Sequence, residues 1–88
     1  MKKYTFIAEY KGGTYITQYV ALNLTDALPL WVMGLDKKIF SKSKRDKILL
    51  EVNDSDLYPT PLRDVENVWC STYLSGKSFL LLNIIETA

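Results

Sequence analysis

Two adjacent glycines, Gly12-Gly13, stand between two runs in which apolar and polar residues alternate. Alternation with a period of two is typical of a β-strand with one buried face. Glycine supplies the positive φ angles that a two-residue hairpin turn requires. The sequence therefore predicts a β-hairpin over residues 3–22, in which Lys11 pairs with Thr14.

The two faces of this predicted hairpin differ in character. One face carries aromatic side chains and no charge: Tyr4, Phe6, Tyr10, Tyr15 and Tyr19. The other face mixes charged residues with three branched apolar residues, Ile7, Ile16 and Val20. We expect the aromatic face to lie against the core of the protein, because a buried sheet face carries few charges.

A helix is predicted after the hairpin, beginning near Thr25 or near Leu28 and ending near Phe40. Thr25-Asp26 offers a capping hydroxyl and an acid for the first turn. One apolar stripe at helical spacing consists of Leu28, Trp31, Val32, Leu35 and Ile39. A second stripe consists of Leu30, Met33 and Phe40. Either the first turns are deeply buried, or the second stripe meets a partner.

The second half of the chain reads as β-structure with one loop. Residues 47–52 are predicted to form a strand, and residues 53–64, which contain two prolines, a loop. A second hairpin is predicted over about 65–74 and 77–86, turning at Ser75-Gly76. Both of its faces are apolar, so 79–85 is expected to be a central strand covered on both sides.

The predicted fold class is α+β, as one domain over residues 1–88 with the order β-β-α-β-β-β. About five strands form a mainly antiparallel sheet, with one helix packed on one face. One helix leaves the other face uncovered, which predicts a partner, most simply a second copy of the chain. The contact is predicted to use either this sheet face or the outer stripe of the helix, and the residues predicted for it are Ile7, Ile16, Val20, Leu30, Met33 and Phe40.

The chain offers little catalytic chemistry. It contains no histidine, which removes the commonest general base and metal ligand. Its single cysteine, Cys70, lies in the predicted strand segment VWCSTY and is expected to be a buried packing residue. We therefore expect no catalytic residue, cofactor or metal. Whether the acidic residues of 51–66 bind a cation stays open, because aspartates are also ordinary turn formers.

A basic stretch offers an alternative function. Six of the eleven lysine and arginine residues fall within residues 37–47. The predicted phosphate contacts for a nucleic-acid-binding module are Lys42, Lys44, Arg45 and Lys47. The competing interpretation, which we favour, is a solvated helix end, where lysines are favourable because of the helix dipole.

The composition is typical of a soluble protein. The net charge is +1, so no strong field draws the whole chain to nucleic acid or to an anionic membrane. No apolar run approaches the ~20 residues of a membrane-spanning helix. We expect a cytoplasmic location, with no membrane contact.

The first thirty residues resemble the opening of HicB-type antitoxin domains. The motifs are Lys3-Tyr4-Thr5, Glu9-Tyr10, Gly12-Gly13-x-Tyr15 and Thr25-Asp26-Ala27-Leu28. The family also has a third strand with a proline-glycine pattern before the helix, and an appended DNA-binding segment. Neither has a counterpart in this sequence. The resemblance implies a small bacterial protein that binds and neutralises a partner protein.

Overall fold

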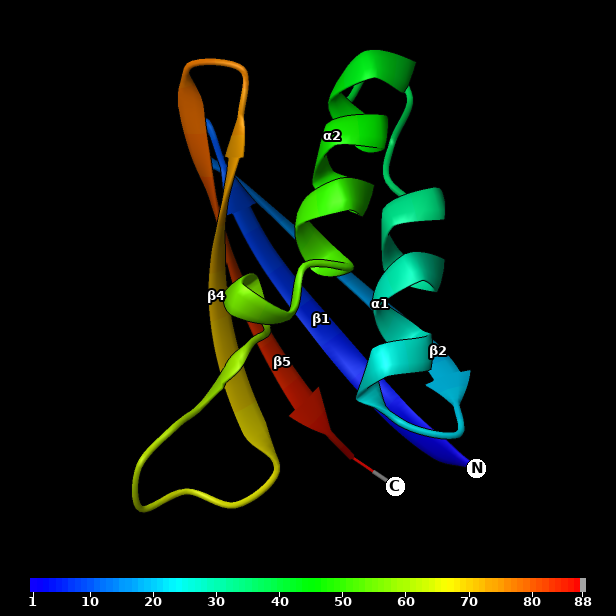
Figure 1. The fold of residues 1–88 in the computed structure, drawn as a ribbon, viewed down its shortest axis with the longest axis vertical. Helices are drawn as coiled ribbons and strands as arrows, with labels where there is room; N and C mark the ends of the chain where they lie inside the picture. The colour runs from blue at the N-terminus through cyan, green and yellow to red at the C-terminus, as the bar shows by residue number, and fades with distance from the viewer. Residues whose placement is uncertain (88) are drawn as a thin grey trace.

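In the computed structural model, which describes residues 1–87, five strands form one sheet and two α-helices lie on the same side of it (Figure 1). The strands are β1 (Lys2–Tyr10), β2 (Gly13–Ala21), β3 (Thr60–Pro61), β4 (Val68–Ser75) and β5 (Ser78–Glu86). The helices are α1 (Leu24–Met33), α2 (Lys42–Val52) and the short 3-10 helix η1 (Ser55–Leu57). The strand order is β2-β1-β5-β4-β3 with antiparallel neighbours, which confirms the α+β class.

The predicted strand over residues 47–52 is wrong, because these residues form the second half of α2. Ser41 caps this helix: its Oγ accepts a hydrogen bond from the backbone N–H of Lys44 at 3.3 Å. Ile48 and Val52, one helical turn apart, are both buried. A short apolar run fits a strand or a helix equally well. Here the Ser41 cap and the burial of one helix face, with Ile48 and Val52, favour the helix.

One strand of the sheet, β3, lies in the segment that was expected to be a loop. Pro61 pairs with Trp69 of β4, and the N–H of Leu62 donates to the carbonyl of Val68 at 2.9 Å. Proline is compatible with this position because β3 is the outermost strand, where the missing N–H is not needed.

α1 begins close to the first of the two predicted starts, but its cap is Asn23. The side-chain Oδ1 of Asn23 accepts a hydrogen bond from the N–H of Asp26 at 2.9 Å. The helix ends at Met33, well before the predicted end near Phe40. Gly34 is a poor helix former, and the hydroxyl of Tyr19 fills the space that a Cβ at this position would need.

The first hairpin is confirmed, but its turn lies one residue earlier than predicted. Tyr10 pairs with Gly13, so the turn is Lys11-Gly12, with φ angles of 49° and 81°. Gly13 belongs to β2, where the ring of Tyr15 covers the space of a Cβ. A displacement of one residue at the turn shifts each strand partner by two. Every side chain therefore keeps its predicted face.

The second hairpin is also confirmed, with its turn one residue later than predicted, at Gly76-Lys77. β5 is an interior strand, as expected. Both helices lie on one side of the sheet, so within this chain β5 is covered on one face only (Figure 1). Phe79 and Leu81 are exposed on the other side.

The core lies between the sheet and the two helices. The ring of Phe6 stacks on Trp31 with centroids 5.8 Å apart, and Tyr10 meets Phe40 with centroids 4.8 Å apart. Phe40 is 2% exposed. Its predicted place in a surface contact is therefore wrong, because the chain turns after α1 and directs this ring into the core.

β1 and β5 are neighbours in the middle of the sheet, although they lie at opposite ends of the described chain. Phe6 pairs with Ile84 in their ladder. Beyond the ladder, the N–H of Thr87 donates to the carbonyl of Lys3 at 2.8 Å. The centre of the sheet is thus formed by residues that are far apart in sequence.

Candidate protein interface on the outer sheet face

The sheet face opposite the helices, which we call the outer face, carries few charges. Strand alternation assigns to it the odd-numbered residues of β1 and β5 and the even-numbered residues of β2 and β4. Among these positions only Lys3 and Glu9 are charged. A sheet face in contact with water usually carries more charged and polar residues than this face does.

Apolar side chains occur in two places on the outer face. The β1–β2 patch consists of the half-buried Ile7, its partner Ile16 and, beyond the hydrogen-bonded Thr5 and Gln18, Val20. The β4–β5 patch consists of Leu74, Phe79 and Leu81. Phe79 is 65% exposed and Ile16 is 63% exposed. Grouped apolar side chains with a polar surround are typical of a protein contact surface.

An open hollow of about 650 Å³ lies beside the turn of the first hairpin. Its lining includes Glu9, Lys11, Thr14, Thr72, Phe79 and Leu81. Glu9 pairs with Leu81 across β1 and β5, so a carboxylate stands directly beside an apolar wall. This arrangement suits an apolar side chain of a partner, with polar groups at the rim that orient it.

The six residues predicted for a partner contact belong to two alternative surfaces. The three from the first hairpin lie on the outer face as the β1–β2 patch. Leu30 and Met33 are 41% and 70% exposed, but they belong to α1 on the other side of the sheet. The sixth, Phe40, lies in the core. Apart from Phe40, the residues of both alternative surfaces are therefore exposed or half-buried.

Two prominent residues of the outer face were missing from that set. Phe79 and Leu81 were expected to be covered because both faces of their strand are apolar. The alternation of this strand already assigned them to the face opposite Leu80 and Leu82. The missing information was that α1 and α2 share one side of the sheet, which leaves the β4–β5 patch open.

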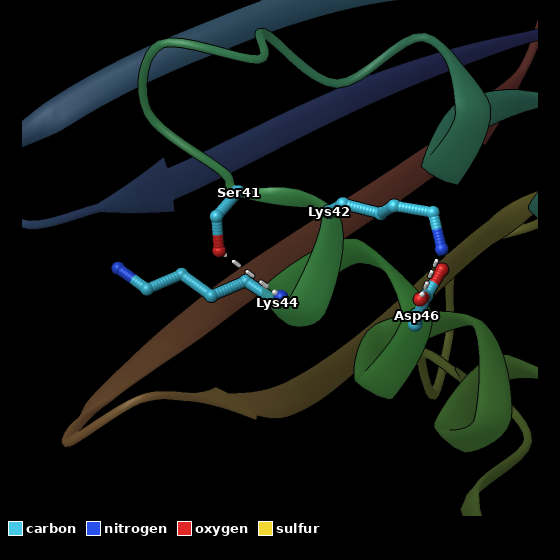
Figure 2. A network of polar contacts seen from close by, with 4 residues as sticks. All are labelled: Ser41, Lys42, Lys44 and Asp46. Atoms are coloured by element: carbon cyan, nitrogen blue, oxygen red, sulfur yellow. Dashed lines mark hydrogen bonds and ion pairs between the residues drawn. The ribbon is translucent and has the colours of Figure 1, made fainter.

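The predicted phosphate contacts all lie in the first half of α2: Lys42, Lys44, Arg45 and Lys47. Lys42 Nζ lies 3.2 Å from Asp46 Oδ2, and Lys44 Nζ lies 5.9 Å from the centroid of the Tyr10 ring. Figure 2 shows the two lysine side chains pointing in opposite directions. Arg45 is half-buried. Lys42 and Lys44 therefore do not converge on one point, as the donors of a single phosphate site would.

Residues 1–87 contain no group of three Cys, Asp or Glu side chains placed to hold a metal ion. Asp54 Oδ1 instead accepts a hydrogen bond from the N–H of Asp56 at 2.9 Å and caps η1. Cys70 lies on the outer face, opposite Asn83, and is half-buried where full burial was expected.

Comparisons with protein-family models, with curated proteins and with solved structures found no match. Within the part of the chain that the structure describes, no helix is long and apolar enough to cross a membrane.

Proposed function

We propose that this chain is a small, non-enzymatic protein–protein interaction module that acts as a homodimer in the cytoplasm. The observation that carries the proposal is the outer face itself. Both helices pack on one side of the sheet, and Ile16 and Phe79 stay mostly exposed on the other. Apolar surface of this kind gains free energy when a partner removes it from water.

A second copy of the chain suits this surface for two reasons. The outer face has only two charged residues, Lys3 and Glu9, so two copies meet without strong repulsion. A chain of 88 residues also buries a modest fraction of its surface on folding. Burial of the β1–β2 patch in a dimer therefore adds usefully to its stability.

Size-exclusion chromatography with light scattering tests the proposal. We expect the wild-type chain to elute as a dimer and Ile16→Asp as a folded monomer, because the new carboxylate would stand against the second copy in place of an apolar side chain. Leu50→Asp is the matched control, since Leu50 is 74% exposed on α2 and away from the outer face. A monomeric wild type, or an unchanged dimer in Ile16→Asp, would contradict the proposal.

Nucleic-acid binding through the basic half of α2 is the alternative proposal. It has less support, because Lys42 is already paired with Asp46 and Arg45 is half-buried. The resemblance to HicB-type antitoxin domains remains a prediction of the sequence. It would make the partner a second bacterial protein, which the same outer face could bind.

A further inference from the structure

The two edges of the sheet differ in how their backbone hydrogen-bonding groups are satisfied. At the β4 edge, β3 pairs with Cys70 and Trp69, and farther along Glu51 Oε1 accepts the N–H of Leu74 at 3.4 Å. At the other edge, β2 has no strand beside it among the described residues. Proteins usually protect such an edge with charge, proline or a bulge. The sequence of β2, GTYITQYVA, has neither a charge nor a proline.

The backbone groups on the open side of β2 can be assigned. The carbonyl of Lys3 accepts a hydrogen bond from Thr87, on the β5 side, so the odd-numbered residues of β1 direct their backbone groups to β5. The even-numbered residues of β1 bond to the odd-numbered residues of β2. The residues of β2 that direct N–H and C=O away from the sheet are therefore Thr14, Ile16, Gln18 and Val20.

The middle residue of β2, Thr17, has an unpaired side-chain hydroxyl. Its Oγ1 is buried and finds no hydrogen-bond partner within residues 1–87. Buried hydroxyls are nearly always bonded, so an exception at the centre of an open edge calls for an explanation. A partner strand at this edge would bring new donors and acceptors next to it.

We propose that β2 pairs antiparallel with β2 of a second copy, with the two-fold axis at Thr17. Ile16 then pairs with Gln18 of the second copy, and Thr14 with Val20. This register bonds all the outward N–H and C=O groups of these four residues. It is also the register centred on the middle of the strand.

On the helix side of the sheet, this pairing sets each Thr17 opposite its own copy. The position is a non-hydrogen-bonded pair, where side chains approach most closely, and threonine pairs at such positions bond through their hydroxyls. Rotation about χ1 to another staggered rotamer can turn Oγ1 to its partner. Tyr15 meets Tyr19 of the second copy on the same face.

A second copy is the occupant because the edge is complementary to itself. β2 carries no charge that would repel an identical strand or select a charged peptide. The inference rests on the self-association in the proposed function and specifies its geometry. Edge pairing joins the two outer faces side by side, whereas face-to-face stacking would leave both β2 edges open.

Proline at position 18 tests the pairing. Gln18→Pro removes an outward N–H that β1 does not use, and proline is tolerated at such edge positions. We expect the dimer dissociation constant to rise about a hundredfold or more, from bonds lost on both sides of the axis. Gln18→Ala, which keeps the N–H, should remain a dimer. A dimeric Gln18→Pro would overturn the inference.

Hydrogen exchange of the wild-type chain gives a second test that needs no variant. At concentrations where light scattering shows a dimer, we expect slow exchange at the amides of Thr14, Ile16, Gln18 and Val20, and faster exchange on dilution. Fast exchange at these amides in the dimer would overturn edge pairing and leave the proposed function standing. A wild-type monomer at all concentrations would overturn both.

Discussion

The ring of Phe6 in β1 lies nearly parallel to the indole of Trp31 in α1, with 6° between their planes. Trp31 also contacts Tyr73 of β4, with ring centroids 6.0 Å apart. One side chain of α1 therefore meets aromatic rings from two strands of the sheet. Because Trp31 is 2% exposed, its loss would leave a large cavity between helix and sheet.

We expect Trp31→Ala to lower the free energy of unfolding by about 3–5 kcal/mol. Met33→Ala, two residues later on an exposed part of the same helix, should change it by less than about 0.5 kcal/mol. Urea denaturation followed by circular dichroism, at one fixed protein concentration, measures both. Equal losses in the two variants would place the indole outside the core.

Ser41→Ala tests whether residues 47–52 belong to a capped helix. Loss of the bond from Lys44 N–H to Ser41 Oγ should lower stability by about 1 kcal/mol. Ser43→Ala, an exposed serine in the first turn of the same helix, is the control and should have little effect. If thermal unfolding shows the same change for both serines, the cap at Ser41 is not functional.

Lys11→Asn should stabilise the first hairpin. Lys11 has a φ angle of 49°, which asparagine adopts at lower cost than lysine. Asn-Gly is also the preferred pair for this kind of turn. The lost contact of the Lys11 ammonium with the Tyr10 ring, 5.3 Å away, offsets part of the gain. We expect a net increase of about 0.5 kcal/mol in the free energy of unfolding. A decrease would indicate a different turn.

Tyr73 makes stability depend on alkaline pH. Burial raises the pKa of its phenol above the ordinary value of 10.0, and the nearby Glu51 carboxylate raises the pKa further. The folded state therefore favours the neutral phenol. Its contribution is complete below about pH 10 and declines as the pH rises from there through the folded-state pKa.

The same hydroxyl makes no hydrogen bond of good geometry among the described residues, although Ser71 lies close enough to lower its pKa in part. Tyr73→Phe should therefore raise stability at pH 7 by about 1 kcal/mol. It should also weaken the loss of stability above pH 10. Part of that loss should persist, because burial also raises the pKa of Tyr4. Urea titrations from pH 7 to pH 11 that give parallel curves for the two proteins would refute this assignment.

Charge reversal in α2 tests the alternative function. The variant replaces four residues with glutamate: Lys42, Lys44, Arg45 and Lys47. We expect wild-type binding to a fluorescent single-stranded oligonucleotide to stay in the non-specific range, with Kd about 10⁻⁴–10⁻⁶ M at physiological salt. The variant should remain a dimer. Tighter binding that weakens steeply with salt and disappears in the variant would favour the nucleic-acid proposal.

Both hairpins could be predicted from the sequence because alternation determines side-chain faces independently of the turn. The turns at Lys11-Gly12 and Gly76-Lys77 each differ from prediction by one residue. A shift of this size moves each cross-strand partner by two positions, so every side chain stays on its predicted face of the sheet. The membership of the β1–β2 patch was therefore predictable, although the exact partners across the ladder were not.

α2 was missed because its first half is almost entirely polar and its apolar run is short. The available signals were Ser41 as a cap and the spacing of Ile48 and Val52 by one helical turn. Phe40 was misplaced for a related reason. With the helix assumed to continue past Gly34, its ring fell on an outer stripe. The end of α1 at Met33 instead turns this residue inward.

The sequence predicted one uncovered sheet face, but not which of the two apolar faces of the second hairpin lies on it. That depends on α1 and α2 packing against the same side of the sheet, which is a tertiary relationship. Phe79 and Leu81 have the composition of a buried strand face, and only the placement of the helices shows that they remain exposed.

The pairing of β1 with β5 also determines the order in which this protein can assemble during translation. The partner of Phe6 in the middle of the sheet is Ile84, which the ribosome adds roughly 4–16 s later at ordinary elongation rates. Until β5 leaves the exit tunnel, both edges of the nascent β1–β2 hairpin are unpaired, and the edge formed by β2 carries no charged residue. Nascent chains on neighbouring ribosomes of one messenger would therefore be able to join through β2 before either copy has completed its own sheet.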